Sequence, residues 1–130
     1  MGYTIAEKIL SRHSRKEVKA GDVAVCNIDF CFSQDGTSEL VIDNFRSLGK
    51  KKIFNKQCFG IVIDHSTPSP RQAISNIHQK LRSFSREQGS LLFDVGCGIS
   101  HQVIPEAGHI LPGNLVVGAD SHTCTYRALN

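Results

Sequence analysis

The chain has 130 residues, 40% of them hydrophobic and 21% charged, with a formal net charge of +3. This is the size and composition of one soluble globular domain, and no apolar run approaches the roughly 20 residues that a membrane helix needs. The lysines cluster only at residues 50–52, where they suit a solvated helix end. Such a small, scattered charge does not indicate a nucleic-acid footprint, so we expect neither a nucleic-acid nor a membrane partner.

The amino terminus and the cysteines indicate the cytoplasm. The first eight residues lack the positive region and long apolar core of a secretory signal. Five cysteines at irregular spacing argue against a disulfide framework, so we expect reduced thiols. Cys97 lies in a glycine turn, where we expect a small filler thiol rather than a reactive one, and Cys124 is expected to pack beneath the turn before it.

The amino-terminal third predicts a helix and a strand. Thr4 and Glu7 have the spacing of a capping box, which predicts that a helix begins after Thr4. Residues 23–30 are dense in Val, Ile and Phe and predict a strand. A polar loop is expected at residues 33–37.

A second helix and a second strand are predicted next. Ser38 is expected to cap a helix that Gly49 ends, since glycine tolerates the positive φ of that position. Residues 59–63 form a short, continuously apolar run. Such a run is typical of a strand that is covered on both faces.

The last elements complete an alternating pattern. Pro70 suits the first turn of a helix whose apolar residues recur as far as Phe84 and whose pattern runs up to Gly89. Residues 91–95 and 115–117 supply further strands. Strands that alternate with amphipathic helices predict a layered α/β fold with a largely parallel sheet and flanking helices, in a single domain over residues 1–130.

Polar, ionisable residues follow three of these predicted strands. In chain order they are Asp64, His65, His101, Asp120, Ser121 and His122. Because parallel strands present their carboxyl ends at one edge of a sheet, we expect these side chains to gather there. A carboxylate beside a histidine favours the imidazolium and fixes which nitrogen faces a ligand. The pattern therefore predicts a site that moves protons or holds a small anion.

Each of these residues also has a structural alternative. A histidine after a glycine turn, like His101, is often structural, and Asp120 or Ser121 can cap the next helix. Gln34 can simply close the turn that follows it. The remaining histidines are expected to be surface or helix residues: His13, His78 and His109.

Several short motifs, taken in order, resemble one enzyme family. They are Asp29, Gln34-Asp35-Gly36-Thr37, Asp64-His65, Phe93-Asp94-Val95-Gly96 with Gly98-Ile99, His101-Gln102, Pro105-Glu106, Leu111-Pro112-Gly113 and residues 117–123. From residue 4 to about Tyr126 the chain resembles the N-terminal part of an aconitase-family hydro-lyase. Within that family it is most similar to the large subunits of 3-isopropylmalate dehydratase and homoaconitase.

The resemblance implies roles for the residues that match. Asp64 and His65 correspond to the pair that handles the leaving hydroxyl, and His101 to a histidine that interacts with the carboxylate of Asp120. The implied catalytic residues are Asp64, His65, His101, Asp120 and His122, and the implied substrate-binding residues are Gln34 and Ser121. Many isopropylmalate enzymes have His in place of Gln34, so the choice of hydroxy acid stays open.

The resemblance also implies a cofactor and partners. The family uses a [4Fe-4S] cluster whose cysteine ligands lie downstream of such a segment. None of the five cysteines matches them, so no metal ligand is assigned in this chain. Residues 1–130 would then form one partial domain, without the cluster-ligand and swivel domains. The expected partners are a small hydroxy-carboxylate substrate, such as 2-isopropylmalate or homocitrate, and a small subunit with the swivel domain.

The carboxyl end departs from the family pattern, and the function keeps alternatives. Arg127 stands where the family usually has glycine. The main interpretation is part of a cluster-dependent hydro-lyase that is inactive by itself. A second is a non-catalytic remnant or assembly module that binds small carboxylates or a partner subunit. A third, a zinc hydrolase using His65, His101 and His122, is disfavoured because the sequence has no His-x-x-x-His pair.

Overall fold

The computed structural model describes residues 2–129 and contains one parallel sheet. Its strands are β1 (Phe30–Gln34), β2 (Phe59–Val62), β3 (Leu91–Phe93) and β4 (Val116–Ala119), in the order β3-β2-β1-β4. The helices are α1 (Ile5–Ser14), α2 (Ser38–Ser47), α3 (Gln72–Gln88) and α4 (Ser100–Glu106), with short 3-10 helices η1 (Lys56–Cys58) and η2 (Thr123–Leu129). The predicted α/β fold with a parallel sheet and flanking helices is confirmed.

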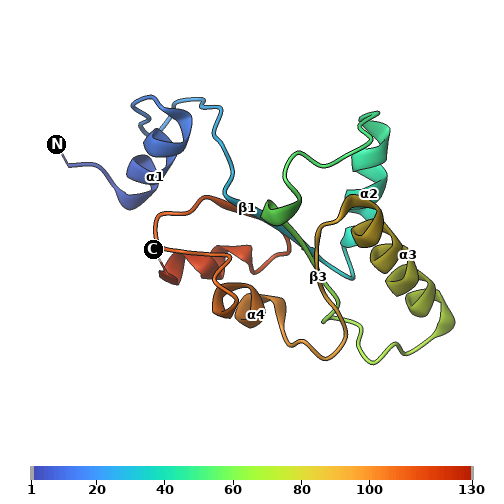
Figure 1. The fold of residues 1–130 in the computed structure, drawn as a ribbon. Coiled ribbons are helices and arrows are strands. Elements are labelled where there is room, and N and C mark those ends of the chain that lie inside the picture. The colour runs from blue at the N-terminus through green and yellow to red at the C-terminus, as the bar shows by residue number, and fades with distance from the viewer. Residues whose placement is uncertain (1, 130) are drawn as a thin grey trace.

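The two faces of the sheet build two hydrophobic cores. Figure 1 shows α2 and α3 together on one side of the sheet and α4 on the other. Because side chains alternate along a strand, Phe30 and Phe32 of β1 pack on the α4 side with Tyr126. Ile61 of β2 packs on the opposite side against Leu81 of α3. Both faces of the sheet are therefore covered, which agrees with the continuously apolar strands.

Helix boundaries follow the predicted local chemistry at three places. The Thr4 hydroxyl accepts a hydrogen bond from Glu7 N at 3.2 Å, and the Glu7 carboxylate accepts one from Thr4 N at 2.8 Å. The capping box is therefore confirmed. Gly49 and Gly89 follow α2 and α3 with φ of 68° at each, so both helices end at the expected glycine.

The position predicted for the first strand is wrong. Residues 23–28 lie outside the sheet, with Val23 fully exposed, and β1 begins only at Phe30. The strand continues through Ser33 and Gln34, which the sequence suggested were loop. These polar residues are buried because their side chains have partners, among them a 2.7 Å hydrogen bond between Ser33 Oγ and Ser38 Oγ.

Two predicted helix starts are also corrected. Ser38 does not cap α2: the cap position is Thr37, and the Ser38 hydroxyl contacts β1 instead. Pro70 lies before α3, which begins at Gln72 with Arg71 as its cap residue. Strand β3 is shorter than predicted, and β4 begins one residue later and extends to Ala119.

The histidines outside the predicted site pack against interior residues of the protein. His13 of α1 and His78 of α3 do lie in helices, but both are buried beside a carboxylate. The ring of His109 stacks on Phe30 with centroids 5.2 Å apart.

The two cysteines expected to fill space or pack, Cys97 and Cys124, are both exposed, so those expectations are wrong. In the described part of the chain, no helix combines the length and apolarity needed to cross a membrane.

Candidate active site

The carboxyl ends of β2 and β4 bring distant segments of the chain together. Asp64 and His65 lie just beyond β2, and the Asp120 to His122 segment follows β4 directly. His101 comes from α4, the helix that follows β3. The structure therefore places the predicted residues at one edge of the sheet, as the parallel topology requires.

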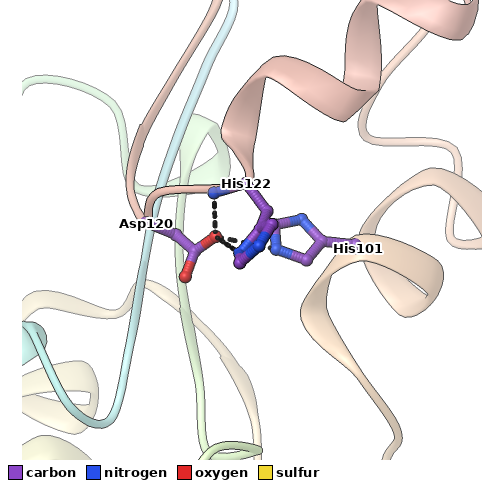
Figure 2. A group of neighbouring side chains, drawn as sticks. All are labelled: His101, Asp120 and His122. Atoms are coloured by element: carbon purple, nitrogen blue, oxygen red, sulfur yellow. Dashed lines mark hydrogen bonds and ion pairs between the residues drawn. The ribbon is translucent and has the colours of Figure 1, made fainter.

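Asp120 is the centre of the group. Its Oδ1 accepts hydrogen bonds from His101 Nε2 at 2.8 Å and from the backbone N of His122 at 2.7 Å (Figure 2). Its Oδ2 lies 3.3 Å from His65 Nε2. Only 3% of the Asp120 side chain is exposed. One buried carboxylate thus joins two imidazoles from different elements.

His65 lies between two carboxylates. Its Nδ1 is 2.7 Å from Asp64 Oδ1, and its Nε2 faces Asp120. A carboxylate oxygen only accepts hydrogen bonds, so a neutral ring satisfies one side and an imidazolium satisfies both. Burial by itself lowers the pKa of His65, but the hydrogen bond and charge of Asp64, with the charges of Asp120 and Asp35, raise it above its usual value. The arrangement favours the protonated ring.

The pKa of Asp120 moves in the complementary direction. Burial raises it, but the backbone hydrogen bond from His122 and the hydrogen bond and charge of His101 outweigh burial and lower it. The carboxylate therefore stays ionised near neutral pH. An ionised Asp120 fixes the ring orientation of His101 and lies opposite the protonated His65.

The loop after β2 is tied to the start of α4. The second oxygen of Asp64 accepts a hydrogen bond from Ser100 N at 2.6 Å. The Ser100 carbonyl in turn accepts one from the Tyr126 hydroxyl at 3.1 Å. Burial raises the pKa of Tyr126, with a smaller effect from the nearby carboxylates, so this hydroxyl remains a donor. These contacts connect α4 and η2 around His101.

Ser121 and His122 form the exposed part of the group. The Ser121 hydroxyl and His122 Nδ1 are 3.1 Å apart, and 73% of the His122 side chain is exposed. A hollow of about 470 Å³ beside His122 is lined by His101, His122 and Tyr126, among others. The exposed His122 imidazole at this hollow is therefore accessible to a small ligand.

Gln34 lies at the same edge of the sheet, but its side chain bonds within its own turn and not to the Asp120 group. It is the last residue of β1 and is 7% exposed. Its Oε1 accepts a hydrogen bond from Gly36 N. The amide therefore closes the turn after the strand, which was the structural alternative for this residue, and its role in substrate binding stays a prediction.

Two residues of the site region were missed by sequence reasoning. Asp35 is 3% exposed and accepts hydrogen bonds from the loop that carries Asp64 and His65. Its sequence context, an aspartate before glycine, looks like an ordinary surface turn. Ser100 begins a seven-residue helix with Pro105 inside it. Without a helical repeat of apolar residues, the sequence offered no signal for that helix.

The donor set does not match a site for three histidines or an iron–sulfur cluster. Two groups of potential ligands, His101-Asp120-His122 and Asp35-Asp64-His65, each have atoms within 4.8 Å of one another. These are the groups found among residues 2–129, and neither contains a cysteine. His65 divides its nitrogens between two carboxylates, so His65, His101 and His122 do not present free nitrogens to one point, as a zinc hydrolase would require.

Comparison with known proteins identifies the family. Residues 7–130 match the model of the aconitase family (aconitate hydratase). The chain is 48% identical over 125 residues to 3-isopropylmalate dehydratase large subunit 1 of Thermotoga maritima, covering 96% of the chain and 29% of the relative. It is 46% identical to the protein of the same name from Pyrococcus abyssi, with coverage of 99% and 31%. It therefore spans about three tenths of these curated relatives, and it belongs to the aconitase family.

Proposed function

We propose that this chain supplies proton-transfer and substrate-binding groups to a hydro-lyase. The proposed substrate is a hydroxy di- or tricarboxylic acid, with 2-isopropylmalate favoured by the names of the relatives. The observation that supports it best is the buried Asp120 carboxylate, which joins His65 and His101 at one edge of the sheet. Residues 1–130 would be one partial domain of the complete enzyme.

The chemical difficulty in such a reaction is the departure of hydroxide. Hydroxide is a poor leaving group near neutral pH, so a proton donor must reach its oxygen as the carbon–oxygen bond breaks. His65 fits this role because its two neighbouring carboxylates raise its pKa and so favour the imidazolium. Its Nδ1 proton is held on Asp64 at 2.7 Å, whereas Nε2 is farther from Asp120, at 3.3 Å. We assign the Nε2 proton as the one transferred to the leaving hydroxyl.

The exposed groups suit the carboxylates of the substrate. Ser121 and His122 lie at the surface of the site and offer a hydroxyl and an imidazole to an anion. His101, which lines the hollow together with His122, is oriented by its hydrogen bond to Asp120. Oriented donors fix the substrate relative to the proton donor, which lowers the entropic part of the barrier. If Gln34 takes part, its Nε2 is the donor, since its Oε1 is used in the turn.

The proposal includes a cofactor and a partner that this chain does not hold. Dehydratases of the aconitase family use an iron–sulfur cluster, and we propose a [4Fe-4S] cluster ligated by residues outside these 130. The clusters of ionisable side chains among residues 2–129 contain no cysteine. The relatives are named large subunits, so we also propose a small subunit as partner.

A titration separates a surviving half-site from a non-catalytic module. 2-Isopropylmalate or citrate is titrated into the chain by calorimetry, and the variants Asp120→Asn, Ser121→Ala and His122→Ala are compared with wild type. We expect each variant to weaken binding about tenfold, the equivalent of one hydrogen bond to a charged group. Asp43→Asn, at an exposed carboxylate on α2, is the control and leaves binding unchanged. Binding that is indifferent to the three site variants favours the remnant.

A further inference from the structure

The strand order gives β1 a special position. In the sheet order β3-β2-β1-β4, β1 lies between the two strands that carry the proposed catalytic loops. It pairs in parallel register with both of them. The residues just after β1 are therefore the ones that lie next to the β2 loop on one side and the end of β4 on the other.

Asp35 holds the β2 loop through three backbone hydrogen bonds. Its Oδ1 accepts from Asp64 N at 3.2 Å and from His65 N at 2.8 Å, and its Oδ2 accepts from Ser66 N at 2.8 Å. The Asp35 side chain is 1% exposed. A buried carboxylate bound to three consecutive amides fixes the backbone of the residues that carry the proposed proton donor.

His78 supports Asp35 from the helical layer. Its Nε2 lies 3.3 Å from Asp35 Oδ2, and the His78 side chain is 3% exposed. Burial raises the pKa of Asp35, but the backbone hydrogen bonds from His65 and Ser66 and the hydrogen bond from His78 lower it below its usual value. The carboxylate is thus ionised, with all its contacts inside the protein.

Thr37 holds the other flanking strand. Its hydroxyl donates to the carbonyl of Ala119 at 2.6 Å, across 82 residues of sequence. Ala119 is the last residue of β4 and directly precedes Asp120. One side of the Asp35–Thr37 turn therefore contacts the backbone of His65, and the other contacts the backbone next to Asp120.

We propose that Asp35 and Thr37 are positioning residues that together set the distance between His65 and Asp120. Neither touches the substrate in this proposal; each acts through the backbone of a neighbouring loop. The inference rests on the proposed function for its catalytic meaning, but the positioning itself is measurable on the protein without turnover.

The first test removes the carboxylate charge of Asp35. In Asp35→Asn the amide NH₂ replaces one acceptor oxygen, so the backbone hydrogen bonds to that oxygen are lost and those to the remaining oxygen are no longer charge-assisted. We expect hydrogen exchange at the amides of Asp64, His65 and Ser66 to become at least tenfold faster, measured by NMR on the chain. Asp94→Asn is the matched control.

Asp94 suits this control because it is also an aspartate that directly follows a strand and accepts hydrogen bonds. It accepts two hydrogen bonds at 2.7 Å from Arg82, and β3 is an edge strand. The control variant should leave exchange in the β2 loop as in wild type. Equal acceleration in both variants would mean general loosening of the fold and would overturn the proposal.

The second test changes no charge. Thr37→Val keeps the shape of the side chain but removes the hydroxyl that donates to Ala119, whereas Thr37→Ser keeps the donor. We expect the NMR signals of the Asp120 and His122 amides to shift in the valine variant and to return toward wild type in the serine variant. Unchanged signals in the valine variant contradict a positioning role for Thr37, whether or not Asp35→Asn folds.

The third readout is turnover by the complete enzyme. A catalytic group displaced by about 1 Å costs about 100-fold in rate, so Thr37→Val should lower kcat far more than it changes KM, with Thr37→Ser close to wild type. If the wild-type enzyme dehydrates none of the hydroxy acids tested, the proposed function fails while the NMR tests still decide the positioning. If NMR shows displacement but kcat is unchanged, positioning as a catalytic device is overturned.

Discussion

At the scale of single residues, Asp120 combines burial with several donors. Its Oδ1 accepts hydrogen bonds from His101 and from the His122 amide, and its Oδ2 faces His65 at a longer distance. A carboxylate this buried is unfavourable unless its partners compensate for the lost hydration. The partners come from two loops and a helix, so the charge of Asp120 stabilises the arrangement of the whole group.

Asp120→Asn tests this role. The asparagine keeps the size of the side chain but removes the charge that holds His101 and favours protonated His65. We expect kcat of the complete enzyme to fall by about 10²–10⁴-fold, the usual contribution of acid–base catalysis, and the pKa of His65 to move toward its ordinary value. The pH dependence of kcat/KM and NMR titration of the imidazole measure the two effects. An unchanged His65 titration would contradict the assigned coupling.

A second residue-scale prediction concerns pH and stability. The folded-state pKa of His65 is raised, chiefly by Asp64 against the opposing effect of burial. Such a group stabilises the folded state fully below its unfolded pKa of about 6.5, and the contribution is lost as the pH rises through the folded pKa. The wild type should therefore exceed His65→Gln in free energy of unfolding most below about pH 6.5, and less above it. Urea unfolding at a series of pH values measures the difference; an advantage that grows with pH contradicts the prediction.

At the scale of elements, local chemistry predicted helix ends better than strand ends. The capping box at Thr4 and the glycines after α2 and α3 act within a few residues, so the sequence contains their full cause. The start of β1 does not have a local cause. Residues 23–28 have strand-like composition but remain outside the sheet: pairing with β4 begins only at Phe30 and pairing with β2 only at Cys31.

Strand β4 offers an element-scale prediction at Gly118. A Cβ at this position would overlap the ring of Phe32 and the Thr123 hydroxyl, whereas a Cβ at Gly60 of β2 would lie 3.2 Å from Phe30. Overpacking a core costs about 1–3 kcal/mol. We expect Gly118→Ala to lie at the upper end of that range and Gly60→Ala at the lower end, as measured by urea unfolding. Equal small losses would show that β4 shifts to admit the methyl group.

At the scale of the whole molecule, the sequence predicted which segments meet but not how they are bonded. A parallel sheet gathers its carboxyl ends at one edge, so the convergence of Asp64, His65, His101 and Asp120 follows from the fold class. Sequence reasoning did not identify Asp35 as the carboxylate that holds the β2 loop. That contact depends on β1 lying beside β2, and strand order is a property of the assembled sheet.

The positions of the five cysteines lead to the last prediction. Three of the cysteines lie at the edge of the sheet opposite the site: Cys26 precedes β1, Cys31 lies at its start, and Cys58 directly precedes β2. Only Cys97 and Cys124 follow strands. A cluster needs more thiolates than these two. After anaerobic incubation with ferrous iron and sulfide, we expect the isolated chain to show no cluster absorbance and no turnover of 2-isopropylmalate. A complete two-subunit dehydratase treated in the same way serves as the positive control. Turnover by the 130 residues alone would mean that the side chains around Asp120, with His65 as proton donor, suffice without the cluster ligands that we place outside this chain.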